Sequence, residues 1–306
     1  MAYHLPVLAS ESIEGLNIQP DGIYVDATFG GGGHAALILK ELGDKGRLIG
    51  FDQDEDAMAN APNDPRFTFV KANFRDLKRF LRLHGAPKVH GILADLGVSS
   101  HQLDEASRGF SYRFKAELDM RMNNAEKRTA ADVINYSDEA TLLRIFGEYG
   151  EVRNARTLAA ALVQERKTRP IRSIEDFVAI LDPLVRGQRQ RYLSQVFQAL
   201  RIEVNDEMGA LAEFLKQSLE VLHPGGRLAI ISYHSLEDRM VKNFMKTGNA
   251  EGKPEQDFYG NIHRPFTLIS KKAILPSEKE VRENPRARSA KLRVAAPQPP
   301  KVEKGD

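Results

Sequence analysis

The sequence predicts an α/β protein with a Rossmann-like, mostly parallel, doubly wound sheet that is interrupted by an all-helical insertion. Three observations support this prediction. Short apolar segments alternate with helical segments over the first hundred residues, four consecutive glycines follow the first apolar segment, and between residues 102 and 205 only helical patterns occur. Alternation of strands and helices at this spacing is typical of parallel sheets covered on both faces.

Composition limits the possible classes of protein. The 306 residues are 42% hydrophobic and 28% charged, which is enough to bury a large core in one or two domains. No apolar run reaches the roughly 18 residues of a membrane span, and the first residues lack the basic start and apolar core of a secretory signal. We therefore expect a cytoplasmic protein that does not interact with membranes. The absence of cysteine excludes disulfides and thiolate metal sites.

The first half of the sheet follows from the order of the segments. A short helix at 8–16 and a Pro-Asp-Gly turn lead into the first strand, and each later strand follows a helical segment. The expected strands span 23–26, 47–52, 67–70 and 89–95, and the expected helices after the first three strands lie near 35–39, 54–61 and 74–83.

The second half of the chain begins with the insertion. Apolar residues there recur at helical spacing, and Ser173-x-x-Asp176 is a capping pair before one of these helices. A long helix over 211–222 then returns to the sheet. It precedes a strand at 227–233, a helix at 236–245 and two late strands near 265–270 and 290–294. We expect a core of 1–101 and 206–295, an insertion of 102–205 that recognises the substrate, and a disordered tail of 296–306 rich in Pro and Lys.

The glycine run is the most informative stretch. Four adjacent glycines lose much backbone entropy on folding, so a ligand that approaches the backbone closely is the better explanation. Three expected strands end in an acid, at Asp26, Asp52 and Asp95, and the carboxyl ends of adjacent parallel strands line one crevice. Asp52 lies twenty residues after Gly32, the spacing at which an acid accepts hydrogen bonds from ribose hydroxyls.

Two nucleotide-like ligands fit this pattern. A dinucleotide presents a pyrophosphate to the helix N-terminus, whereas S-adenosylmethionine is a cation that needs backbone contacts and acids. Asp26 precedes the glycines by four residues, which favours the methyl donor. A nicotinamide-dependent oxidoreductase stays open as the alternative enzyme, because the glycine spacing permits it.

Longer motifs add a family resemblance. Together they resemble the signatures of bacterial 16S (small-subunit) rRNA cytosine-N4 methyltransferases of the RsmH (MraW) type, in family order and over nearly the whole chain. These stretches are residues 24–34 (YVDATFGGGGH), 95–100 (DLGVSS), 102–104 (QLD), 108–111 (RGFS), 118–122 (LDMRM), 197–202 (FQALRI), 205–207 (NDE), 232–239 (SYHSLEDR) and 284–289 (NPRARS).

The resemblance implies a fold and a reaction. The fold is that of class I S-adenosylmethionine-dependent methyltransferases with a helical insertion, and the reaction is N4 methylation of a decoding-centre cytidine in the ribosomal P site. The partner would be small-subunit rRNA or the 30S particle. A non-catalytic RNA-binding factor that retains this fold is a further alternative. The oligomeric state does not follow from the sequence, and we expect no structural metal site because no compact ligand cluster is visible.

The resemblance also assigns residues. The family's cofactor contacts map onto Gly32, Gly33, His34, Asp52, Phe74, Asp95 and Gln102. The glycines would admit the methionine moiety, Asp52 would accept the ribose hydroxyls, Phe74 would pack near the adenine, and Asp95 with Gln102 would lie towards the sulfonium and the base. Asp95 is also the candidate catalytic acceptor for an N4 hydrogen, with a purely cofactor-orienting role as the alternative. Phe74 could equally be a core aromatic, and His34 an ordinary residue of the helix start.

The substrate contacts are less well specified. Many amino-methylating enzymes have two prolines and an aromatic residue after the strand-end acid, but here Leu96, Gly97 and Val98 follow Asp95. Candidates for stacking on a flipped cytidine are Phe110, Tyr112, Tyr233 and His234. Residues 118–122 are interpreted as a lid or, preferably, as a packed turn.

Basic clusters are the candidate RNA contacts. They comprise Arg166, Lys167, Arg169 and Arg172; Arg186, Arg189 and Arg191; and Arg286, Arg288, Lys291 and Arg293. The stretch before Phe197 departs from the His-Pro-Ala-x-Arg-Thr of many relatives, so the family resemblance does not assign the exact RNA contact there, although it still implies the fold.

Overall fold

The structure is a computed structural model that describes residues 6–254, 256, 260 and 264–298. The chain forms two compact units, one of residues 1–97 and 210–306 and the other of residues 98–209. The expected boundaries of the insertion, 102 and 205, lie four residues inside these limits at each end. Among the described residues, every helix is too short or too polar to span a bilayer.

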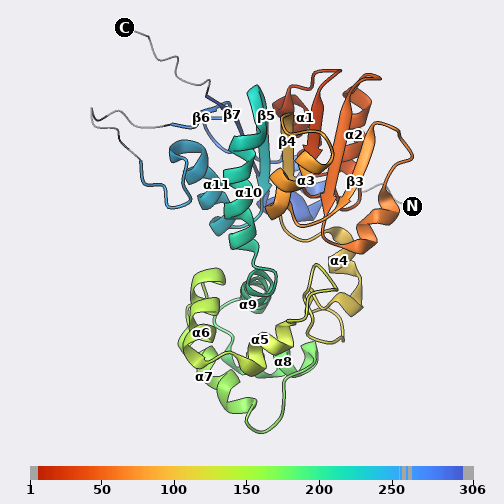
Figure 1. Cartoon of the computed structure of the whole chain (residues 1–306). Coiled ribbons are helices and arrows are strands. Elements are labelled where there is room, and N and C mark those ends of the chain that lie inside the picture. Colours follow the sequence, from red (N-terminus) through yellow and green to blue (C-terminus); the bar gives the residue numbers. More distant parts are fainter. Residues whose placement is uncertain (1–5, 255, 257–259, 261–263, 299–306) are drawn as a thin grey trace. The chain divides into compact units, whose positions relative to one another are not determined.

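The first unit is built on one seven-stranded sheet with the strand order β3-β2-β1-β4-β5-β7-β6 (Figure 1). Its first five strands run parallel, and β7 is antiparallel to both β5 and β6. The strands are β1 (Ile23–Asp26), β2 (Arg47–Asp52), β3 (Phe67–Lys71), β4 (Val89–Asp95), β5 (Leu222–Ser232), β6 (Phe266–Leu268) and β7 (Lys291–Pro297). The predicted parallel sheet is confirmed, with an antiparallel pair at one edge.

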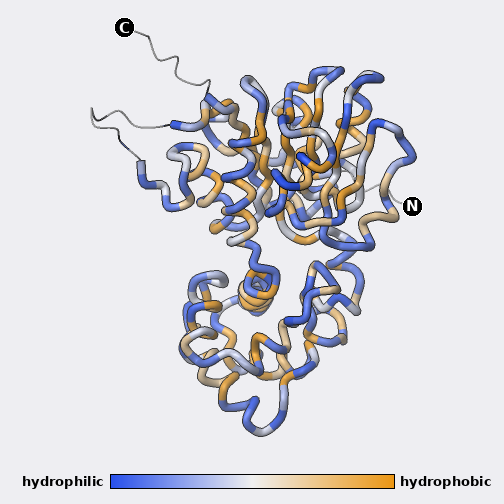
Figure 2. The backbone as a smooth tube through the Cα atoms, viewed as in Figure 1, coloured by the Kyte–Doolittle hydropathy of each residue, from blue (hydrophilic) through white to orange (hydrophobic). Residues whose placement is uncertain are grey.

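Helices cover both faces of this sheet. On one face α3 (Leu77–Leu83), α10 (Glu207–Val221) and α11 (Ser235–Thr247) bury apolar side chains against the strands, with Phe214 of α10 fully buried. On the other face α1 (Ala9–Leu16) and α2 (Gly33–Glu41) do the same. Figure 2 shows the apolar residues along the strands and the hydrophilic ones towards the connecting loops. Burial on both faces explains why the strands are almost continuously apolar.

Several element limits differ from the expected ones. The stretch at 54–61 forms a 3-10 helix (Glu55–Asn60), and 74–83 is a 3-10 turn (Phe74–Asp76) followed by α3. The strand β7 extends to Pro297, so the first two residues of the expected tail belong to the sheet, while residues 299–306 lie outside the described residues. The remaining helix of this unit, α12 (Glu278–Glu283), precedes β7 and was not anticipated.

The second unit is helical around its own apolar core, which includes Phe146, Phe177 and Leu200. Its helices are α4 (Ser100–Asp104), α5 (Ala130–Tyr136), α6 (Glu139–Arg144), α7 (Ala155–Glu165), α8 (Ile174–Leu181) and α9 (Arg189–Val204). A π-helical turn (Ile145–Tyr149) continues α6. The expectation of helices alone was incomplete, because residues 109–129 are irregular and Glu117 bridges to Ser173 in an antiparallel contact.

Candidate active site

The glycine loop connects β1 to α2 and is partly explained by its own geometry. Gly32 has a φ of 74° and precedes the first residue of α2, and a Cβ there would lie 3.1 Å from the Phe29 ring. A side chain at this position would be both strained and crowded. A Cβ at Gly31, in contrast, would meet no atom within 4 Å. Local packing therefore does not require a glycine at the exposed position Gly31.

Asp52 holds the glycine loop from the end of β2. Its Oδ2 accepts a hydrogen bond of 2.8 Å from the Gly30 amide, and its Oδ1 accepts one of 2.8 Å from the Asp54 amide. Burial raises the pKa of Asp52 to about 6, although these amide hydrogen bonds oppose the shift. Each carboxylate oxygen has a second lone pair that can still accept a ligand hydroxyl.

Asp26 ends β1, which lies between β2 and β4 in the sheet, and its side chain is almost fully buried. Its Oδ1 accepts a 3.2 Å hydrogen bond from the Thr28 amide, whereas its Oδ2 has no hydrogen-bond partner among the described residues. Burial raises the pKa of Asp26 to about 6. A buried carboxylate oxygen without a donor is unusual, and it suits a ligand that is cationic.

His34 begins α2 and is also buried. Its Nε2 lies 3.0 Å from the Val7 carbonyl oxygen, and because a carbonyl only accepts, Nε2 carries the proton. Its Nδ1 lies 3.8 Å from Asp95 Oδ2, and burial lowers the pKa of the imidazole. His34 therefore ties the segment before α1 to the glycine loop, a contact that its position in the sequence did not predict.

Asp95 ends β4 beside Asp26. Its amide donates a 2.7 Å hydrogen bond to Thr28 Oγ1, and its Oδ1 accepts one of 2.7 Å from the Tyr233 hydroxyl. Its side chain stays 23% exposed, so it is accessible to a substrate. Burial raises the pKa of Asp95 to about 7; the Tyr233 hydrogen bond opposes this shift and the nearby Glu237 adds to it.

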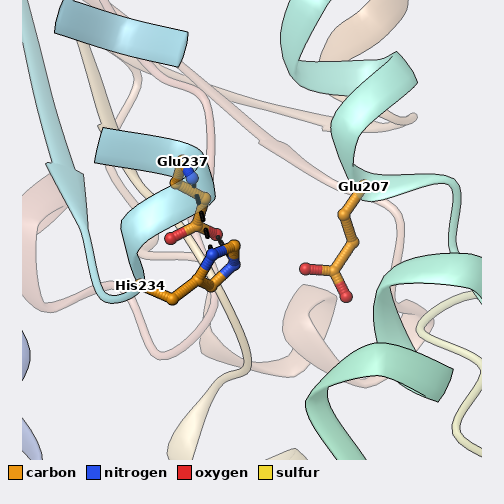
Figure 3. Close-up of side chains that lie close together, drawn as sticks. All are labelled: Glu207, His234 and Glu237. Atoms are coloured by element: carbon orange, nitrogen blue, oxygen red, sulfur yellow. Dashed lines mark hydrogen bonds and ion pairs between the residues drawn. The ribbon is translucent and has the colours of Figure 1, made fainter. Parts of the chain in front are cut away.

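Tyr233 follows β5, and the stretch after it fixes its position. The Tyr233 amide donates a 2.9 Å hydrogen bond to Glu237 Oε2, while Glu237 Oε1 lies 3.1 Å from His234 Nε2 (Figure 3). Glu237 is buried in the first turn of α11. Tyr233 and His234 were candidates for base stacking. The structure instead gives Tyr233 a contact with the candidate catalytic acid and gives His234 a position at the start of α11.

The other residues that the family resemblance assigned are placed as follows. Phe74 follows β3 and packs edge-on against Phe214, with 5.1 Å between ring centres and 62° between the ring planes, so it is at least partly a core residue. Gln102 belongs to the second unit, where it forms a capping box with Ser99: Ser99 N–H donates to Gln102 Oε1 and Gln102 N–H to Ser99 Oγ, both at 3.1 Å. The structure thus shows a local structural role for Gln102.

Residues 118–122 form a packed turn. Met120 is fully buried with a φ of 63°, and its carbonyl accepts a 2.8 Å hydrogen bond from Asn205 Nδ2. The amide of Met122 donates to Asn205 Oδ1 at 2.7 Å. The same core contains Phe110, and Tyr112 packs on Phe197 at 5.6 Å between ring centres. Packing therefore accounts for both of these candidate stacking residues.

Much of the charge of two basic clusters is used inside the protein. Arg166 donates to the Ile134 and Ser137 carbonyls at the end of α5, and Arg169 lies 3.1 Å from Asp176. In the third cluster Lys291 and Arg293 both pair with Asp238.

Replacing Tyr233 with phenylalanine is expected to move the pH profile of the reaction to higher pH. The variant loses the hydrogen bond that lowers the pKa of Asp95, and one hydrogen bond to a charged group corresponds to about one to two pH units. With Asp95 as the expected acceptor in its ionised form, turnover near pH 7 should fall and recover at higher pH. Rates measured from about pH 6 to pH 9 would check this, and an equal loss at every pH would indicate a structural role only.

The sequence and the fold are similar to those of known proteins. The MraW methylase family matches residues 1–298. The chain is 58% identical over 295 residues to "Ribosomal RNA small subunit methyltransferase H" of Parabacteroides distasonis, covering 96% of this chain and 97% of that protein. It is 56% identical over 296 residues to the protein of the same name from Flavobacterium johnsoniae, covering 96% and 98%.

Among solved structures, a putative rRNA methylase from Clostridium thermocellum is similar with a TM-score of 0.45 at 13% identity, over 96% of this chain and 99% of that chain. A family match over almost the whole chain, together with relatives above half identity, settles the membership. The chain belongs to the MraW methylase family.

Proposed function

We infer that the protein uses S-adenosylmethionine to methylate N4 of a cytidine in 16S small-subunit rRNA. The single observation that carries this is the set of acids at the ends of the adjacent strands β2, β1 and β4, in a chain of the MraW methylase family. The relatives are named as small-subunit rRNA methyltransferases. Family membership also argues against the nicotinamide-dependent oxidoreductase.

The site residues fit this methyl donor. Asp26 adds a buried carboxylate, whose Oδ2 has no donor among the described residues, to the negative end of β1, and Asp52 has lone pairs for the ribose hydroxyls. Gly32 and Gly33 keep the loop free of side chains, while His34 holds the loop through Val7. We propose Phe74 for the adenine and Gln102 for the donor contact that the family resemblance assigns. When bound, S-adenosylmethionine supplies an electrophilic methyl group on a sulfonium.

We propose Asp95 as the catalytic acceptor, with support from its partial exposure and its hydrogen bond from Tyr233. Its partly exposed carboxylate would accept an N4 hydrogen of the cytidine, which keeps the nitrogen lone pair available for attack on the methyl carbon. The donor would supply the methyl group and leave as the neutral thioether, and the Asp95 carboxylate would take up the surplus N4 proton. Burial raises the pKa of Tyr233, so its hydroxyl stays protonated and orients Asp95.

The substrate is a base that must leave its stack to reach this carboxylate. We propose that the target is the decoding-centre cytidine of the P site, presented by the rRNA or by the 30S particle, and that the helical insertion contributes RNA contacts. A ribosomal substrate places the protein in the cytoplasm.

Transfer of labelled methyl groups tests the function directly. The protein is incubated with labelled S-adenosylmethionine and with unmodified small-subunit rRNA or 30S subunits, and the labelled nucleoside is then identified and mapped. N4-methylcytidine at a single decoding-centre position is the expected product. Absence of label from both substrates would leave the RNA-binding factor as the better explanation, and binding of NAD in place of S-adenosylmethionine by calorimetry would overturn the donor assignment.

A further inference from the structure

Two arginine-bearing stretches that lie far apart in the sequence are joined on the second unit. Residues 151–156 lead into α7, and residues 184–191 lead into α9. The Asn154 side chain donates a 2.9 Å hydrogen bond from Nδ2 to the Leu184 carbonyl. The starts of the two helices are therefore neighbours.

The apolar core fixes the direction in which these stretches face. Val152 and Ala155 are buried in the core of the second unit, and Leu184 and Val185 pack against the same core. The arginines between these anchors all lie on the exposed surface of the unit: Arg153, Arg156, Arg186, Arg189 and Arg191. The fold thus collects five arginines that the sequence presents as two groups.

Most of this charge is not neutralised by the protein. Arg189 forms a two-point ion pair with Asp182, at 2.7 and 3.1 Å. Within residues 98–209, all of which the structure describes, the other four arginines form no salt bridge. They differ in this respect from Arg166 and Arg169, whose guanidinium groups have partners inside the unit.

The surface between these side chains is open. Residues 186–191 are all exposed, and a Cβ at Gly187 would meet no atom within 4 Å. Arginine binds phosphate through two parallel hydrogen bonds, and closely spaced arginines without acidic partners attract a polyanion. A run of backbone phosphates satisfies both requirements, because phosphate oxygens match the two-point geometry of the guanidinium group.

We propose that Arg153, Arg156, Arg186 and Arg191, here called the arginine surface, bind the phosphate backbone of the RNA substrate. This proposal rests on the proposed function, because it takes the partner to be small-subunit rRNA. The arginine surface positions the RNA without reading its sequence, since phosphate contacts carry no base information.

Salt dependence of binding tests the proposal. The full chain and a variant with Arg153→Gln, Arg186→Gln and Arg191→Gln are titrated with unmodified small-subunit rRNA at several salt concentrations. Each lost phosphate contact lowers the slope of log K against log salt by about 0.7 to 0.9, so the slope of the variant should be smaller by about two to three. Donor affinity by calorimetry and the circular dichroism spectrum should match those of the wild type.

A matched control removes the same charge from exposed positions of the second unit that lie outside the candidate RNA-binding clusters, with Lys115→Gln, Lys127→Gln and Arg128→Gln. Its slope should stay close to that of the wild type. Equal slope changes in both variants, or none in the arginine-surface variant, would overturn the proposal. Methyl transfer by the wild type is measured in parallel. If the wild type transfers methyl groups but the arginine-surface variant keeps the wild-type slope, only the arginine-surface proposal is wrong. If the wild type transfers no methyl groups, the proposed function is wrong.

Discussion

Replacing Asp95 with alanine is expected to reduce the rate of methyl transfer by about 10²- to 10⁴-fold, the range for loss of a positioned proton acceptor. The alanine cannot accept the N4 hydrogen, and it also leaves the Tyr233 hydroxyl without its acceptor. The rate constant should be measured in single turnovers with saturating donor and RNA, so that changes in binding do not contribute. Binding of S-adenosylmethionine, followed by calorimetry, should change much less than the rate.

The change of Asp95 to asparagine is the companion to this prediction. Asparagine retains an oxygen that accepts a hydrogen bond but has no carboxylate that titrates. The rate of this variant should lie between those of the wild type and the alanine variant. The rate of the wild type is expected to increase with pH through about pH 7, as the pKa of Asp95 implies, and the rate of the asparagine variant should not show this increase. Near-normal turnover of the alanine variant would assign Asp95 to cofactor orientation alone.

Replacing Asp52 with alanine is expected to weaken binding of S-adenosylmethionine by roughly 10- to 100-fold. Hydrogen bonds to a charged group contribute about 1.5 to 3 kcal/mol, and the variant loses both the ribose acceptor and the anchor of the Gly30 amide. Calorimetric titration with S-adenosylmethionine and with S-adenosylhomocysteine measures the effect. The affinity for both ligands should fall by the same factor, because both contain the ribose.

A control separates the ribose contact from general loss of the fold. Asp52→Asn keeps a hydrogen-bond acceptor in place, so its affinity should lie closer to that of the wild type. Thermal unfolding of both variants reports whether the loop anchor is also needed for stability. If the alanine variant is folded and binds the donor with unchanged affinity, Asp52 does not contribute to donor binding.

The strand-end acids were predictable because their position follows from topology. Once Asp26, Asp52 and Asp95 are recognised as the ends of parallel strands, the sheet must bring them to one edge, and the observed order β2-β1-β4 confirms it. The hydrogen bond from Tyr233 to Asp95 was not predictable in this way. It joins side chains 138 residues apart and depends on rotamers and on the Glu237 carboxylate, which no periodicity encodes.

The capping box, the place of β7 in the sheet and the irregular stretch differ in how far the sequence predicts them. The capping box of Ser99 and Gln102 has its usual spacing and was open to prediction. The position of β7 between β5 and β6 was not, because short antiparallel strands can join either edge of a sheet without changing their apolar pattern. The irregular stretch of residues 109–129 also lacked a signal. It is held by single contacts such as the one from Asn205 to Met120, and these contacts leave no repeating pattern in the sequence.

The place of β7 in the sheet has a consequence for synthesis of the chain. This strand comes after every other described strand in sequence, yet it separates β5 from β6 and pairs with both. In addition, Glu280 of α12 accepts a 2.7 Å hydrogen bond from the Leu8 amide, near the other end of the described chain. Since domains fold as units during translation, the contiguous second unit is complete on the ribosome well before the sheet. The sheet of the first unit is completed last, because β7 leaves the ribosome after the strands β5 and β6 with which it pairs.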